Sequence, residues 1–337
     1  MVDDHRLEIT LKSSIDAKRS VTVAVLLSTY NAGPYIDPQI RSLKHNATPF
    51  TLHWIDDHST DGTREAVSAL AKSAGIQLKE WHHSQHLGVP NAFFQLLECV
   101  EADIYLFCDQ DDIWQPGKID ATVKALLPDI NSPVLCFSEP LAFNDGEPEI
   151  LRNLSDLWPS LANLLQESRM FMPICIPGHT HGFTRPLQEI FLKHKGIART
   201  YAFMHDWWLY NIATASGTVR FVCNVPTTLY RRHQNNFTAG PGHLSGSWVT
   251  NTWNAHQAAR RIMAKNAHGF VLAKPTMTPG SKLERFFEIA RIISTIDQRQ
   301  SPATLARLAW RGALWRNWYE AAWLIAVCLC SNANTAR

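Results

Sequence analysis

The chain has 337 residues, of which 45% are hydrophobic and 18% charged, and its net charge is +2. This composition supports a sizeable core, and the length fits one large domain with a smaller one. The weak net charge gives no strong field that would point to nucleic acid or another polyanionic partner, and no apolar stretch reaches the roughly 18 residues of a transmembrane helix.

Apolar strands alternate with helices in the first half of the chain. Short apolar runs predict strands at 21–27, 52–55, 76–81, 104–108 and 134–137. Apolar residues at helical spacing predict a helix after each of the first four strands. This alternation predicts an α/β domain with a mostly parallel sheet. No glycine-rich dinucleotide motif or P-loop follows the first strand.

The second half of the domain is less regular. We expect loop and helix over about 144–170, a turn between short strands in 174–183, a helix from His205 through Ala215, and a strand at 219–223. Within the turn, His179 and His181 form a His-x-His pair. Such a pair can bind a metal, but no third ligand lies nearby in the sequence.

Three acids follow the strand 104–108 directly: Asp109, Asp111 and Asp112. The carboxyl ends of parallel strands are where open α/β sheets bind ligands. In an extended chain residues i and i+2 point the same way, so Asp109 and Asp111 are expected to face one ligand. A divalent cation that bridges them to phosphate oxygens would relieve their mutual repulsion. For Asp112, a turn or a helix N-cap is an equally good interpretation.

Five motifs in order resemble one known family: residues 25–31, 55–63, 107–114, 205–208 and 230–236. They are similar to those of the inverting family 2 glycosyltransferases, which have the GT-A fold, a Rossmann-like nucleotide-sugar-binding fold. The sequence Asp-Gln-Asp-Asp-Ile-Trp is similar to the rhamnosyltransferase-like branch, which builds bacterial O-antigen, capsule and related glycans. The resemblance covers roughly residues 21–240.

The resemblance implies roles for the residues that would bind the sugar donor. Thr29 and Tyr30 would line the nucleotide pocket, and Asp57 would hydrogen-bond the base. Asp109 would contact the ribose or the metal. Asp111 would ligate Mg²⁺ or Mn²⁺ on the diphosphate.

The resemblance also implies the catalytic residues. Asp206 would be the base that takes the proton of the acceptor hydroxyl, while Arg231 and His233 would steady the leaving diphosphate. An N-cap is the alternative interpretation of Asp206. Trp207 and Trp208 could stack on an acceptor sugar or pack in the core, and the sequence leaves both open.

Some positions depart from the family pattern. His58 stands where the family usually has Gly, so this turn would require a positive φ from a histidine. His86 replaces a more usual Asn, and His179 and His181 occupy a segment where smaller or apolar residues are expected. None of these positions coincides with the expected metal ligands or base.

We therefore expect three regions: a leader at 1–20, the GT-A glycosyltransferase domain at 21–240, and a C-terminal helical region at 241–337. In the last region, Trp and Arg residues surround most of a helix within 305–329. Two interpretations remain open for this helix, packing on the catalytic domain or a partner, and lying at a membrane surface.

The expected activity is metal-dependent transfer of L-rhamnose from dTDP-rhamnose to a lipid-linked glycan at the cytoplasmic face of the inner membrane. The mixed-charge start and the scattered cysteines, seven in number, favour a cytoplasmic protein. A UDP-hexose or UDP-N-acetylhexosamine donor is an alternative. A nucleotidyltransferase would need a basic loop after the first strand, which is missing. A non-catalytic glycan- or membrane-binding scaffold is the remaining alternative. The presence of the expected metal ligands Asp109 and Asp111 and of the expected base Asp206 argues against it.

Overall fold

The computed structural model describes residues 20–153 and 176–222, positions 225, 227–233 and 236, the helical residues 264–273, and positions 287, 290, 291 and 294. The expected leader, apart from its last residue, and the tryptophan-rich segment at 305–329 lie outside the described residues. Among the residues that are described, no helix combines the length and apolar character needed to cross a membrane.

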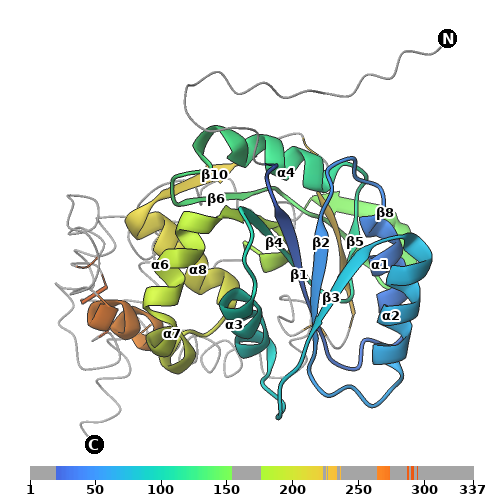
Figure 1. Ribbon diagram of the computed structural model, residues 1–337, viewed down its shortest axis with the longest axis horizontal. Coiled ribbons are helices and arrows are strands. Elements are labelled where there is room, and N and C mark those ends of the chain that lie inside the picture. The colour runs from blue at the N-terminus through green and yellow to red at the C-terminus, as the bar shows by residue number, and fades with distance from the viewer. Residues whose placement is uncertain are drawn as a thin grey trace, which may run out of the picture.

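A seven-stranded, mostly parallel sheet forms the centre of the molecule (Figure 1). Its strands, in spatial order, are β10 (Thr218–Phe221), β6 (Val134–Phe137), β9 (His181–Thr184), β4 (Ile104–Cys108), β1 (Val23–Thr29), β2 (Thr51–Asp56) and β3 (Gln77–Trp81). Of the strands described here, β9 alone runs antiparallel to its neighbours β4 and β6. This arrangement confirms the predicted α/β class and GT-A type of sheet.

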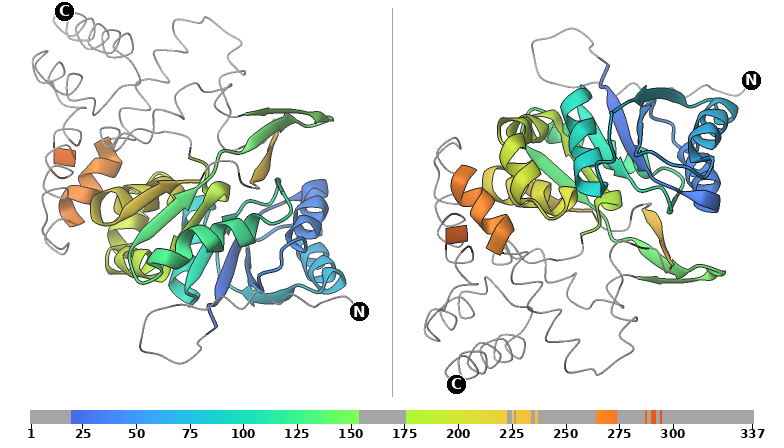
Figure 2. Two further views of the ribbon diagram at one scale, coloured as in Figure 1. Left: turned by 90° about the horizontal axis from the view of Figure 1, so that it is seen from above. Right: turned by 90° about the horizontal axis from the view of Figure 1, so that it is seen from below.

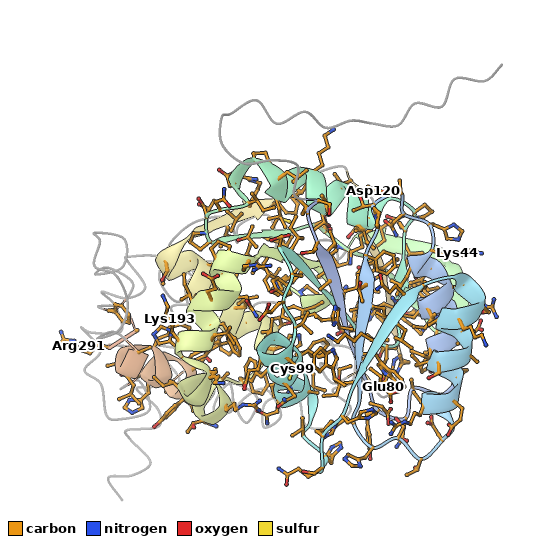
Figure 3. The ribbon with its side chains drawn as sticks, in the orientation of Figure 1. Lys44, Glu80, Cys99, Asp120, Lys193 and Arg291 are labelled. Carbon is orange, nitrogen blue, oxygen red and sulfur yellow. The ribbon has the colours of Figure 1, made fainter. Side chains whose placement is uncertain are left out.

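Helices cover both faces of this sheet. One face carries α1 (Ile36–Leu43), α2 (Thr63–Ala74) and α4 (Lys118–Leu126). The other carries α3 (Val89–Cys99), α6 (Arg185–Lys193), α7 (Lys195–Tyr201) and α8 (His205–Ser216). In β1, Val25 packs on the first face and Leu26 on the second, so both faces of the strand are buried and its sequence does not alternate. Side chains fill the space between sheet and helices, with Asp120 and Lys193 marking α4 and α6 in Figure 3.

A four-stranded second sheet extends from the main body (Figure 2). Its order is β5 (Ile113–Trp114), β11 (Thr228–Arg232), β7 (Leu141–Asn144) and β8 (Glu147–Asn153). The expectation of loop and helix from 144 was wrong for residues 147–153, which form β8. Asp145-Gly146 makes the hairpin turn, and Gly146 has a φ of 88°, which is the Asp-Gly hairpin signal.

Part of the C-terminal region packs on the α8 side of the domain. Residues 264–273 are helical and lie beside α7 in Figure 1. The Phe270 ring stacks on the Trp208 ring with centroids 4.2 Å apart, and Ala267 is fully buried. Residues 264–273 therefore pack on the catalytic domain. The boundary near residue 240 stays a prediction.

Candidate active site

The acid that directly follows β4, Asp109, lies near the first turn of α8. Tyr105 and Phe107 belong to the core on the α3 and α8 face, and the Phe107 and His205 rings make a T-shaped contact with centroids 4.6 Å apart. Asp109 is the next residue in this alternation. Repulsion by the Asp206 carboxylate contributes to raising the pKa of Asp109, so the two acids lie close together.

Asp109 sits in a crowded, low-dielectric environment. Burial, followed by the carboxylates of Asp111 and Asp206, raises the pKa of Asp109 to about 8, although Lys118 lowers it. Lys118 itself is 1% exposed, and its Nζ donates a hydrogen bond of 2.5 Å to the carbonyl of His179. Burial lowers the pKa of Lys118 to about 7. Sequence reasoning did not predict this buried lysine, because lysines are rarely buried.

Asp111 is joined to the end of β11. Its Oδ2 lies 2.9 Å from His233 Nε2, and its backbone carbonyl accepts a 3.0 Å hydrogen bond from Arg231 Nε. Arg231 Nη1 also pairs with Asp145 Oδ1 at 2.9 Å. The Tyr35 ring stacks on the His233 ring with centroids 4.6 Å apart. Three predicted site residues, Asp111, Arg231 and His233, are therefore brought together from segments about 120 residues apart.

Two sets of side chains offer ligands for a divalent cation. In the first, one atom each of Asp109, Asp112 and His179 lie within 4.8 Å of one another. Asp112 Oδ2 and both ring nitrogens of His179 are buried and lack hydrogen-bond partners within the described part of the chain. The second set is Asp111 with His233. Carboxylate oxygens suit Mg²⁺ and Mn²⁺, and imidazole nitrogens suit transition-metal ions, so the residues present fit a divalent cation.

The environment of Asp112 excludes its interpretation as a helix N-cap. The helix after the acids, α4, has Gly117 at its N-cap, so Asp112 is not a helix cap. Instead its Oδ1 accepts the backbone N–H of Arg231 at 3.0 Å, and its Oδ2 lies 3.4 Å from His179 Nδ1. Sequence reasoning noticed His179 in its His-x-His pair, but it did not connect it to Asp112, because the two meet only through the fold.

Asp206 lies in the first turn of α8 and is held by backbone hydrogen bonds. Its Oδ2 accepts the N–H of Gly178 at 2.9 Å, and its Oδ1 accepts the N–H of Trp207 at 2.6 Å. The N-cap of α8 is Met204, so the N-cap interpretation of Asp206 does not hold. Burial raises the pKa of Asp206 to about 6, although both hydrogen bonds lower it. A carboxylate with a pKa in this range is suited to accept a proton near neutral pH.

The residues expected at the nucleotide differ in their exposure. Tyr30, directly after β1, is 48% exposed, and its ring lies 4.7 Å from the His86 ring. Thr29 is buried, and its hydroxyl accepts the Trp54 Nε1–H and donates to Asp56 Oδ1. Tyr30 is therefore better placed than Thr29 to contact a ligand with its side chain.

Asp57 holds the loop that leads into α3. Its Oδ1 accepts the N–H of Leu87 at 2.7 Å, and its Oδ2 accepts the N–H of Gly88 at 2.8 Å. His86 Nδ1 lies 3.1 Å from the same Oδ2. Asp57 is 2% exposed. Its carboxylate therefore fixes the backbone of the 86–88 loop beside Tyr30.

Together, a GT-A type of sheet and acids gathered at the carboxyl end of β4 define the class of enzyme that acts on nucleotide-activated sugars. Residues 24–139 match the model of glycosyl transferase family 2. The chain therefore contains a family 2 glycosyl transferase domain, and the protein is a glycosyltransferase.

Similar proteins support this assignment. The dTDP-rhamnosyl transferase RfbG of Shigella flexneri is 26% identical over 219 residues, which cover 62% of this chain and 72% of that relative. Protein RfbJ of Shigella flexneri is 29% identical over 109 residues, or 32% of this chain and 78% of RfbJ. The mannosyltransferase PcManGT from Pyrobaculum calidifontis, solved with GDP-Man and Mn²⁺, matches 98% of this chain and 84% of its own, with a TM-score of 0.51 and 18% identity. This last likeness shows the shared fold.

Proposed function

We propose that this glycosyltransferase moves L-rhamnose from dTDP-rhamnose to a hydroxyl group of a growing bacterial surface polysaccharide. The observation that carries the proposal is the gathering of residues from the family's motifs at the carboxyl end of β4: Asp111 Oδ2 lies 2.9 Å from His233 Nε2, and the Asp109 carboxylate is repelled by those of Asp111 and Asp206. The sequence similarity to a dTDP-rhamnosyl transferase supports the choice of donor. A UDP-hexose or UDP-N-acetylhexosamine would fit the same chemistry.

In this proposal the nucleotide lies across the carboxyl ends of β1 and β4. The exposed ring of Tyr30 offers a stacking face for the base, beside Thr29 and the loop that Asp57 holds. Arg231 and His233 lie next to Asp111, so they are positioned to bind the diphosphate. The positive charge of Arg231 there would stabilise the negative charge that develops on the leaving group.

The proposed reaction is a single displacement that inverts the anomeric carbon. The acceptor oxygen forms a bond to that carbon while the bond to the diphosphate oxygen breaks, and the electron pair leaves with the nucleoside diphosphate. The Asp206 carboxylate takes the proton of the acceptor hydroxyl. Its two backbone hydrogen bonds fix its orientation, and its partial burial keeps it basic enough for this step.

A divalent cation, Mg²⁺ or Mn²⁺, belongs to this proposal. Asp109 and Asp111 would hold it, with His233 as a further ligand beside Asp111. Such an ion would supply Lewis-acid stabilisation to the diphosphate. The carboxylate oxygens at the site are of the chemical type that binds such ions.

The proposed acceptor is a lipid-linked glycan, which would place the enzyme in the cytoplasm at the periphery of the inner membrane. In this proposal the lipid end of the acceptor would stay in the bilayer. The C-terminal region at 241–337 is the candidate for that contact, and the packing of residues 264–273 on α8 would attach it to the domain.

Thermal unfolding against a panel of nucleotide sugars, with Mn²⁺ or EDTA, tests the donor and the metal. A ligand at about 100 times its Kd stabilises a protein by about 2.7 kcal/mol, which shifts the unfolding midpoint. We expect a shift with dTDP-rhamnose that disappears in EDTA and in Asp111→Asn. The matched control is Asp37→Asn, which removes a carboxylate from an exposed pair with Arg41 on α1. A shift with a UDP-sugar alone would overturn the rhamnose donor, and no shift with any donor would count against the proposal.

A further inference from the structure

The glutamine inside the Asp-Gln-Asp-Asp motif is paired with the backbone of Tyr30. Gln110 Oε1 accepts the Tyr30 N–H at 2.7 Å, and Gln110 Nε2 donates to the Tyr30 carbonyl at 3.2 Å. A side-chain amide thus satisfies both polar groups of one backbone residue. Neither the sequence motifs nor the proposed mechanism gives Gln110 a role.

This pairing continues the sheet beyond its last strand residues. The parallel register of β1 and β4 ends at Leu27 opposite Cys108. Tyr30 and Gln110 lie two to three residues further on, where the backbones are no longer paired. Beyond this point the Gln110 side chain, in place of backbone hydrogen bonds, connects the loop after β1 to the loop after β4 that carries Asp109, Asp111 and Asp112.

Few side chains could make this link. It needs a donor and an acceptor together at the end of a side chain of this length. Glutamate keeps the length but has no N–H, asparagine is shorter by one methylene, and methionine has neither a strong donor nor a strong acceptor. The residue type at position 110 is thus matched to the backbone of Tyr30.

The loop whose backbone Gln110 binds contains a residue with a positive φ. Asn31, the next residue, has a φ of 46°, in the left-handed region that non-glycine residues adopt infrequently. Its backbone N–H donates to Ser59 Oγ at 2.9 Å, and its Oδ1 accepts the N–H of Thr60 at 2.8 Å. The loop is therefore fixed on one side by the segment after β2 and on the other by Gln110.

We propose that Gln110 is a positioning residue for the donor nucleotide, which it orders by fixing the backbone that carries the Tyr30 ring. This inference rests on the proposed function, in which the base stacks on Tyr30. Gln110 lies between Asp109 and Asp111 in the chain. The same segment therefore carries the acids proposed to bind the metal and the diphosphate, and positions the Tyr30 ring that is proposed to stack on the base.

Calorimetric titration of the full chain tests this role with two probes in Mn²⁺ buffer. The first probe is dTDP or UDP, whichever binds the wild type more tightly, and the second is inorganic pyrophosphate, which lacks the base. These hydrogen bonds also exist in the free protein, so only the cost of ordering the Tyr30 loop enters Kd, and a cost equal to the net strength of about one hydrogen bond corresponds to roughly a 10-fold change. We expect Gln110→Met to weaken nucleotide binding by about that factor and to leave pyrophosphate binding unchanged. Gln110→Glu, which keeps the acceptor but loses the donor, should weaken nucleotide binding as well.

Two comparisons separate positioning from a general loss of structure. Gln77→Met, at an exposed position of edge strand β3, is the matched control and should leave both titrations unchanged. Because Gln110 acts through Tyr30, its effect should largely vanish in a Tyr30→Ala background. Unchanged nucleotide binding in Gln110→Met, or equal weakening of both probes, would overturn the inference. A wild type that binds neither nucleotide would instead count against the proposed function.

Discussion

His233 Nε2 lies 2.9 Å from Asp111 Oδ2, across 122 positions of the sequence. Two neighbours hold the histidine in this place. The Tyr35 ring stacks on it, and Asn236 Oδ1 accepts its backbone N–H at 2.6 Å. Tyr35 is in turn tied to the second sheet, because its hydroxyl donates to Asp145 Oδ2 at 3.0 Å. The small sheet thus positions His233 beside Asp111, in the loop that follows β4 of the main sheet.

Replacing His233 by Ala should weaken metal binding. If His233 is a ligand beside Asp111, its loss should lower the affinity for Mn²⁺ by at least roughly 10- to 100-fold, which is the effect of removing even an outer-shell partner of a metal. The measurement is the activity as a function of free Mn²⁺, together with a direct titration of the ion. His82→Ala, which removes an exposed ring that pairs with Glu80 and not with Asp111, is the control. An unchanged Mn²⁺ dependence would show that His233 is not a metal ligand, and would leave it only the proposed role of binding the diphosphate.

The pH profile should report Asp206. Burial raises its pKa to about 6, and the base must be deprotonated to accept a proton. The transfer rate at saturating donor should therefore be level above about pH 7 and fall about tenfold per pH unit well below pH 6. Asp206→Asn should lower kcat by roughly 10²- to 10⁴-fold and leave donor binding nearly unchanged. A profile that stays flat down to pH 5 would exclude Asp206 as the base.

The helical residues 264–273 should contribute to the stability of the catalytic domain. Phe270 is fully buried against Trp208, so Phe270→Ala should reduce the free energy of unfolding by about 3 kcal/mol. Leu272 lies on the same helix and is 45% exposed, and Leu272→Ala should change stability by less than about 0.5 kcal/mol. Urea unfolding measures both. Equal effects would show that the helix does not depend on this contact.

Much of the main sheet could be predicted from the sequence, because its strands are buried on both faces. The run 104–108 gives β4 with the expected ends, and the acids follow it as predicted. The small sheet was missed for a physical reason. The side chains of β11 are mostly half-buried and include Arg231 and Arg232, so the strand has no apolar run. Its pairing with β7 is a long-range contact that local pattern does not encode.

The arrangement of the acids was predicted only in part. The expectation that Asp109 and Asp111 face one ligand assumed an extended chain. The strand ends at Cys108, and the chain then bends at Gln110 and Asp111. Asp112 consequently turns into the core toward His179, while Asp111 turns toward His233. Partners that come from distant segments decide these directions, and the spacing of the motif does not reveal them.

The turn after β2 offers a direct test of a backbone expectation. A positive φ was predicted at His58, and the structure confirms it with a φ of 67°. A side chain in this region costs about 1 kcal/mol relative to Gly, because the Cβ approaches the following carbonyl oxygen. Both His58→Gly and His58→Ala remove the edge contact with the His83 ring, whose centroid lies 4.9 Å away. The Gly variant should therefore be more stable than the Ala variant by about 1 kcal/mol in urea unfolding. An Ala variant of equal stability would mean that the turn relaxes to a negative φ when the ring contact is lost.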